Sequence, residues 1–196
     1  MLFSNLCILY NEGENSASSY YRKEVFLVSM QKAIYQRQAV RDFATRKVAS
    51  SDLDEILDAG QAAPVGMGEY EKFHLTLLTD TNVISRIESD SVSTPYYGAP
   101  AVILVSAQKQ GASVGAMEYV SAGTIVENMA LTATARGLAS CVIMGALGPL
   151  SKDTQLLADI QIPQNFVPVI SLAVGYPNKP QVTPEKSRHE IETDKI

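Results

Sequence analysis

Residues that bind metals or form disulfides are scarce in this sequence. Of its 196 residues only two are cysteine, Cys7 and Cys141, and only two are histidine, His74 and His189. So few ligands cannot build a zinc site of ordinary composition. Two thiols in a chain of this length do not make a disulfide scaffold either. Both classes of site are therefore excluded as explanations of function.

Excess positive charge and long apolar runs are also missing. Sixteen lysines and arginines face 21 aspartates and glutamates, for a net charge of −5, which gives no reason to expect sequence-independent binding to nucleic acid or to an anionic membrane. No apolar run approaches the roughly 18 residues of a membrane-spanning helix. No basic residue precedes the apolar start, so a secretory signal is not indicated. We expect a cytoplasmic protein with neither nucleic-acid nor membrane partners.

The composition that is present suits one folded domain. Hydrophobic residues make up 46% and charged residues 19%, as in globular proteins. The usual catalytic strings GxxxxGK[ST], GxGxxG, HExxH and GxSxG do not occur. His74 falls in a strand pattern and is expected to be packed or half-exposed. Cys141 lies in the apolar string SCVIM, which favours a buried and inert thiol.

Hydrophobic periodicity and turn signals predict helices alternating with strands. The predicted helices cover residues 29–38, 50–62, 81–89, 114–136 and 151–162, and the predicted strands 72–80, 99–107, 139–144 and 167–177. Ser50 or Ser51 is the expected N-cap of the second helix, and Gly137 the expected C-terminal stop of the longest one. The order of elements predicts a mixed sheet covered by helices, an α/β or α+β sandwich.

Four cations stand out along the chain. Arg37 and Arg41 follow the first helix, and Lys186 and Arg188 lie two residues apart near the C-terminus. Residues two apart in an extended segment point the same way, so Arg37, Lys186 and Arg188 together could hold a phosphate monoester. The pattern alone leaves other readings open. The two arginines could complement a helix C-terminus, and Lys186 and Arg188 could be solvated.

Five segments, taken in order and spacing, resemble the FMN-dependent nitroreductase family. They are QKAIYQRQAVRDF, the string from Val48 to Pro64, YYGAPAVILVSA, SAGTIVENMALTATARGLASCVIMG, and PVISLAVGYP followed by KSR. The resemblance runs from about Met30 to Arg188. It implies an FMN-binding domain over residues 30–196 and leaves residues 1–29 as an N-terminal extension without a counterpart.

The implied fold is an α+β three-layer sandwich with a mixed central sheet, assembled as an intertwined homodimer. One FMN would bind in each of two grooves at the subunit interface. Arg37, Lys186 and Arg188 match the residues that bind the flavin phosphate in the family. The resemblance places three further residues of the first motif beside the phosphate or the pyrimidine side of the flavin: Gln38, Ala39 and Arg41.

Two loops complete the implied cofactor site. One reaches the partner's flavin and contains Pro64, Val65 and Gly66. The other lies beneath the isoalloxazine and contains Val142, Met144 and Gly145, where a backbone N–H of Met144 or Gly145 would face flavin N5.

The sequence departs from the family pattern at two places. Ala39 stands where the family usually has serine, which removes one hydroxyl. The string PVGMGEYEK lacks the serine, asparagine, glutamine and tryptophan of the usual Pro-Ser-x-x-Asn-x-Gln-Pro-Trp loop. The phosphate-binding cations are intact, but the loop that lines the substrate pocket differs.

The implied activity is that of an NAD(P)H-dependent flavin oxidoreductase. NADH or NADPH would give a hydride to flavin N5, and a nitroaromatic, quinone or flavin acceptor would then take it by ping-pong kinetics. No catalytic side chain and no metal are required. Two other classes of function remain: a flavin-binding carrier or sensor without turnover, and an interaction module with an incidental anion patch. A specialised flavin reaction, such as dehalogenation or fragmentation of the flavin ring, is a further enzymatic option that ranks below general reduction.

Overall fold

The computed structural model describes residues 30–89, 91, 94–180 and 191–196. The expected N-terminal extension of residues 1–29, with Cys7, lies outside the described residues. So do Lys186, Arg188 and His189.

Four strands form one sheet in the order β1-β2-β4-β3, and each neighbouring pair is antiparallel. The strands are β1 (Phe73–Leu78), β2 (Ala101–Gln108), β3 (Ala139–Ile143) and β4 (Phe166–Gly175). Among the described residues, parallel pairing is confined to an isolated bridge between Ala39 and Ser140 beside β3. The mixed character expected of the sheet rests on that one bridge.

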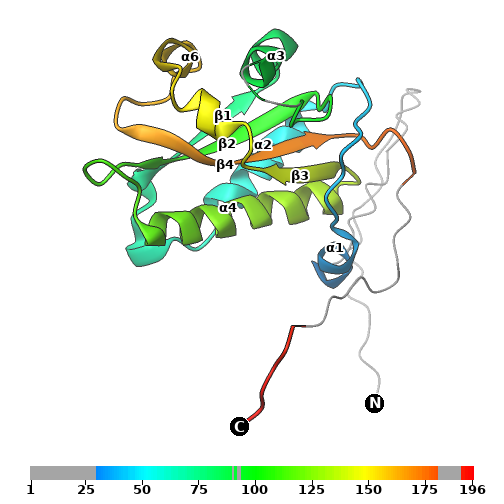
Figure 1. Cartoon of the computed structure of the whole chain (residues 1–196). Coiled ribbons are helices and arrows are strands. Elements are labelled where there is room, and N and C mark those ends of the chain that lie inside the picture. Colours follow the sequence, from blue (N-terminus) through cyan, green and yellow to red (C-terminus); the bar gives the residue numbers. More distant parts are fainter. Residues whose placement is uncertain (1–29, 90, 92–93, 181–190) are drawn as a thin grey trace, which may run out of the picture.

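Helices cover both faces of the sheet and make three layers (Figure 1). One face is covered by α2 (Ser50–Gln61) and α4 (Ala116–Ala135), with α1 (Met30–Gln36) packed against α4. The other face is covered by α3 (Thr81–Ser89), α5 (Leu147–Leu150) and α6 (Thr154–Asp159). Two short 3₁₀ turns, η1 (Gly66–Gly68) and η2 (Tyr70–Lys72), connect α2 to β1. The predicted α+β three-layer sandwich is confirmed.

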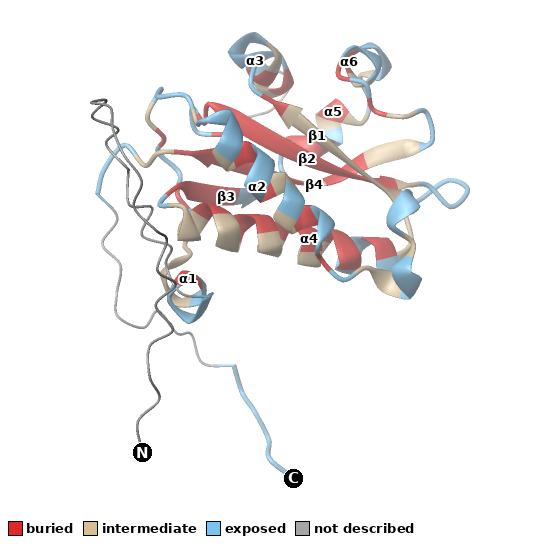
Figure 2. Cartoon of the chain, turned by 180° about the vertical axis from the view of Figure 1, so that it is seen from behind, coloured by how far each residue is buried: buried red, intermediate tan, exposed pale blue. Residues whose placement is uncertain are grey.

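The apolar core lies on both sides of the two central strands (Figure 2). In β2 the residues Ala101–Ala107 are all buried, as the continuous apolar run predicts for a strand covered on both faces. The many small residues of α4 let it pack against α2 and against β2, β3 and β4. Gly137 follows α4 at φ +72°, the left-handed conformation that ends a helix at little cost to glycine.

Three helix ends differ from the sequence expectations. The first helix ends at Gln36, before the predicted Gln38, because residues 37–43 leave it to pair with the sheet. The N-cap of α2 is Ala49, with no side-chain hydrogen bond, so the prediction of a Ser50 or Ser51 N-cap is wrong. In the 151–162 region the helix is limited to α6, where the Asp153 carboxylate accepts a hydrogen bond from the Leu156 N–H at 2.8 Å.

Candidate functional site

The segment that carries Arg37 to Arg41 is fixed against the free edge of β3. The Val40 N–H donates to the Ser140 carbonyl at 3.0 Å, and Ala39 is the residue that bridges Ser140. Farther along, Phe43 is 6% exposed and pairs with Pro177, just beyond β4. Backbone pairing therefore places the predicted cofactor residues 37–41 beside β3, and the predicted cofactor residues 142–145 lie at the end of that same strand.

The two arginines of this segment remain accessible. Arg37 Nε lies 2.9 Å from Glu127 Oε1 of α4, with side chains 36% and 46% exposed. Arg41 is exposed, and its charge acts on the Cys141 thiol of β3. Burial raises the pKa of Cys141, and the positive charge of Arg41 opposes that shift. Cys141 is 3% exposed, so the expectation of a buried thiol is confirmed.

An exposed apolar pair lies at the end of β3. Val142 is 40% exposed in a strand whose other four residues are buried, and Met144, just beyond the strand, is 57% exposed. Residues two apart along an extended chain point to the same side, so these side chains offer one apolar surface. Gly145 follows and is also exposed. Covering these two side chains with another apolar group would be favourable.

A small cavity lies where the 37–41 segment meets β3 and the end of α4. Its volume is about 150 Å³, and its lining includes Gln38, Val40 and Ser140. A volume of this size does not enclose a ligand as large as a flavin mononucleotide. A flavin at this place would therefore lie on an open surface of the single chain.

The Pro64–Gly66 loop is attached to the N-terminal half of α4. Thr124 Oγ1 donates to the Pro64 carbonyl at 2.7 Å, and the Gly66 N–H donates to Ser121 Oγ at 3.0 Å. Beyond the loop, Lys72 Nζ lies 3.6 Å from the buried carboxylate of Glu118. These contacts hold both ends of the 64–72 segment against α4.

Two of the predicted groups of site residues meet at the edge of the sheet, and the third contacts α4. Residues 37–41 and 142–145 share the region of β3. Gly66 contacts α4 at Ser121, about 9 Å from Glu127 along the helix axis at 1.5 Å per residue, and Pro64 contacts it at Thr124, only three residues before Glu127, where Arg37 contacts the helix. The joint site of Arg37 with Lys186 and Arg188 stays a prediction because the last two lie outside the described residues.

Sequence reasoning missed Glu127, the ionic partner of Arg37. In the sequence, Glu127 stands out only as an acidic residue in a segment rich in small and apolar residues. That feature does not identify Arg37, 90 positions away, as its partner. Within the described part of the chain, no cluster of three or more histidine, cysteine, aspartate or glutamate residues has the arrangement of a metal site. No helix there is long and apolar enough to cross a membrane.

Comparison with known proteins identifies the family. The family described as "Putative TM nitroreductase" matches residues 29–195. A protein of Archaeoglobus fulgidus, named "Putative NADH dehydrogenase/NAD(P)H nitroreductase", is 26% identical over 148 residues, which are 74% of this chain and 84% of that protein. The chain belongs to the nitroreductase family, and the family resemblance inferred from its motifs is confirmed.

Solved structures agree in fold. A nitroreductase of Bacteroides fragilis with bound FMN superposes with a TM-score of 0.75 at 25% identity, covering 86% of this chain and 99% of that one. A second FMN-bound nitroreductase, from Desulfitobacterium hafniense, has a TM-score of 0.72 at 18% identity, covering 85% and 98%. The agreement extends over nearly the whole length of each of these two nitroreductases and over 85–86% of this chain.

Proposed function

We propose that this protein is an FMN-dependent oxidoreductase that takes electrons from NADH or NADPH and passes them to a small acceptor of nitroaromatic, quinone or flavin type. The observation that carries the proposal is the pair of exposed apolar side chains, Val142 and Met144, beside a segment bearing two accessible arginines. Membership of the nitroreductase family and the FMN-bound relatives support it.

The chemistry of this surface fits the two ends of FMN. Val142 and Met144 offer an apolar surface on which a planar ring system can stack, and a thioether is a favourable neighbour for an aromatic ring. Arg37 and Arg41 lie two residues to either side of Ala39, which bridges Ser140. Ser140 is four residues before Met144 along β3 and the residue after it. Four residues of extended chain span about 13 Å, which leaves room for a ribityl chain between ring and phosphate.

The residues of this chain would bind and orient the cofactor. When bound, FMN supplies hydride transfer through its N5 atom, and a single site shared by donor and acceptor gives ping-pong kinetics. Arg37, Lys186 and Arg188 would hold the phosphate by charge-assisted hydrogen bonds. Val142 and Met144 would exclude water from one face of the ring, and a backbone N–H of Met144 or Gly145 would donate toward N5.

The proposed assembly is a homodimer with FMN at the subunit interface. Exposed apolar side chains support it: Met30 and Ile34 of α1 are 79% and 50% exposed, and Met117 and Val120 of α4 are 51% and 69% exposed. A groove of about 470 Å³ between α1, α2 and α4 is lined mainly by apolar side chains. Apolar surfaces of this kind mark protein interfaces.

The visible absorption spectrum of the purified protein tests the proposal. We expect the purified protein to carry yellow, bound flavin, either as isolated or after incubation with FMN and removal of the unbound FMN. This absorption should bleach when NADH or NADPH is added without oxygen, and it should return when an acceptor is added. A yellow protein that neither donor bleaches would instead support the carrier or sensor hypothesis. A protein that is colourless after incubation with FMN and removal of the unbound FMN would contradict the proposed function.

A further inference from the structure

Three polar side chains of α4 contact the loop of residues 64–72. They are spaced three residues apart and therefore lie along one ridge of the helix surface: Glu118, Ser121 and Thr124. The two hydroxyls bond the backbone of the loop at Pro64 and Gly66, and the carboxylate faces the ammonium group of Lys72. Both ends of the loop are thus fixed to the same helix, whereas Met67 and Gly68 between them are exposed.

Glu118 is the buried charge of this ridge. It is 4% exposed, and its Oε1 accepts a hydrogen bond from Gln110 Nε2 at 2.6 Å. The same oxygen lies 3.6 Å from Lys72 Nζ, which donates to Glu69 Oε2 at 2.5 Å. The hydrogen bond to Glu69 and the charge of Glu118 raise the pKa of Lys72, against the effect of desolvation. Because a buried carboxylate without a cation is costly, Glu118 holds Lys72 and the end of the loop against α4.

Met67, near the middle of the loop, has a backbone conformation that disfavours a side chain. Its φ is +58°, and Gly68 follows at φ +70°. Glycine adopts this left-handed conformation freely, whereas methionine is strained in it. Such strain persists only where surrounding contacts impose it, and it is concentrated at functional sites. Here the contacts at both ends of the loop impose it.

Packing within the chain does not explain the strain at Met67. The residue is 83% exposed, so its side chain adds little to the core. An exposed thioether is suited to contact another molecule, and sulfur makes favourable contacts with aromatic rings. The loop also lacks the tryptophan of the family pattern, so the large exposed side chains that it offers are those of Met67 and Tyr70.

We propose that Glu118 is a positioning residue: through Lys72 it holds the 64–72 loop so that the Met67 thioether contacts the acceptor. This inference rests on the proposed function, in which the loop reaches the partner's flavin, and it names the acceptor class. Flat aromatic acceptors, such as quinones and nitroaromatics, gain the contact between sulfur and ring, and compact acceptors without a ring do not. Two electrons and two protons pass to the acceptor from the reduced flavin and solvent, and neither Met67 nor Glu118 changes its oxidation or protonation state.

Reoxidation of the reduced protein by two neutral acceptors provides the test. The full-length holoprotein, reduced with NADH or NADPH without oxygen, is mixed in stopped flow with menadione, a quinone, or with dioxygen, which becomes hydrogen peroxide. Met67→Gly should lower the ratio of the menadione rate constant to the dioxygen rate constant about fivefold. The urea midpoint should not fall, because glycine accepts the left-handed backbone. A residue that served only the fold would give the opposite pair of results.

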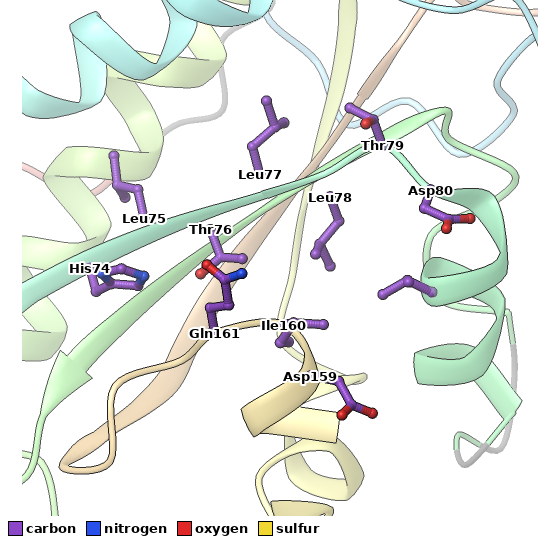
Figure 3. A pocket seen from close by; sticks show the side chains of 11 residues that line it. His74, Leu75, Thr76, Leu77, Leu78, Thr79, Asp80, Asp159, Ile160 and Gln161 are labelled. Atoms are coloured by element: carbon purple, nitrogen blue, oxygen red, sulfur yellow. The ribbon is translucent and has the colours of Figure 1, made fainter. Parts of the chain in front are cut away.

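Gln161→Gly is the matched control, because Gln161 also has a left-handed backbone, at φ +60°. Gln161 lines a pocket of about 520 Å³ between β1, α3 and α6, together with His74 and Thr76 (Figure 3). The same substitution there should leave the ratio of rate constants unchanged. An unchanged ratio in Met67→Gly would overturn the proposal.

Glu118→Gln tests the positioning step. Alone it should lower the same ratio about threefold, and it should have no further effect in the Met67→Gly protein, because both residues act through one side chain. Glu88→Gln is the control, since Glu88 accepts from the Tyr96 N–H at 2.8 Å, away from the loop. If Glu118→Gln does not fold, Lys72→Gln breaks the same ion pair from the side of the loop.

The outcomes separate this inference from the proposed function. No drop in the ratio with Glu118→Gln, or an equal drop in both backgrounds, would overturn the role of Glu118. A flavin that neither donor bleaches would overturn the proposed function and this inference together. Normal bleaching with the same ratio in the wild type and Met67→Gly would overturn this inference alone.

Discussion

Arg37, a residue proposed to bind the cofactor phosphate, is already paired with a carboxylate. Its Nε lies 2.9 Å from Glu127 Oε1, and both side chains are more than one-third exposed. Exposed ion pairs contribute between about 0 and 1 kcal/mol, so an incoming phosphate can replace or share this partner. The Glu127 carboxylate also repels a dianion bound at the same guanidinium. Glu127 would thus oppose phosphate binding at the proposed site.

Replacing Glu127 by glutamine should therefore tighten FMN binding. The amide oxygen still accepts from Arg37, but the negative charge is gone, and we expect an FMN affinity about threefold higher. Riboflavin lacks the phosphate, so its affinity should not change. Flavin-fluorescence titration measures both constants. Glu55→Gln is the matched control, since Glu55 pairs with Arg136. An unchanged ratio of FMN to riboflavin affinity in Glu127→Gln would show that the carboxylate does not act on the phosphate.

Tyr96 makes stability depend on pH at the alkaline end. Its side chain is 0% exposed, and burial raises its pKa to about 12 from 10.0, with the nearby Ser171 hydroxyl opposing that shift. The phenol ionises first in the unfolded chain, so this stability is present below pH 10 and is lost as pH rises toward 12. Tyr96→Phe should flatten the alkaline decline in urea-unfolding experiments and leave the fold at least as stable at pH 7. An equally steep decline in the variant would contradict this assignment.

At the scale of elements, local sequence patterns were sufficient to predict the helices and strands. They were not sufficient to predict which distant segments pair with one another. The helix predicted over 81–89 has those bounds because its amphipathic period is local. The alternation in β1 also correctly separates Phe73, Leu75 and Leu77, which pack on the core cluster of α2 and α4, from Leu78 and His74, which pack on the opposite side of the sheet. The strand order and the Ala39–Ser140 bridge could not be predicted, because they join residues far apart whose backbones carry no sequence signal.

Gly175 tests how β4 supports the segment of the proposed site. A Cβ at this position would lie 2.6 Å from Pro100 Cδ and 3.0 Å from Phe43 Cδ1. The proline ring cannot move aside, so Gly175→Ala should lower the free energy of unfolding by about 1–3 kcal/mol. Gly148→Ala is the control, because nothing lies within 4 Å of its Cβ. Urea unfolding measures both, and equal stability of the two variants would mean that Phe43 is not packed tightly here.

At the scale of the whole molecule, the proposed dimer would cover the exposed apolar side chains of α1 and α4. Val120 is 69% exposed, so Val120→Glu should leave the protomer folded. A charge buried in an interface without a partner is costly, and sedimentation should therefore show a shift from dimer to monomer. Ser85→Glu, on an exposed position of α3, should leave the dimer intact. A wild-type protein that sediments as a monomer would contradict the proposed assembly.

The family and the three-layer fold could be inferred from motifs in this sequence, whereas the pairing that brings two site motifs together could not. The proposed phosphate-binding end of the site would bring Arg37 together with Lys186 and Arg188, far apart in the sequence, and no local pattern fixes such contacts. The pairing of Arg37 with Glu127 likewise arises only when α1 and α4 pack together.

The most direct test of the account is the FMN dissociation constant of the Lys186→Ala, Arg188→Ala double variant, with riboflavin as the ring-only control. Each charge-assisted bond to the phosphate should contribute about 1.5–3 kcal/mol. We therefore predict that FMN affinity falls at least about a hundredfold while riboflavin affinity and circular dichroism stay unchanged. FMN affinity equal to that of the wild type would contradict the proposed phosphate site.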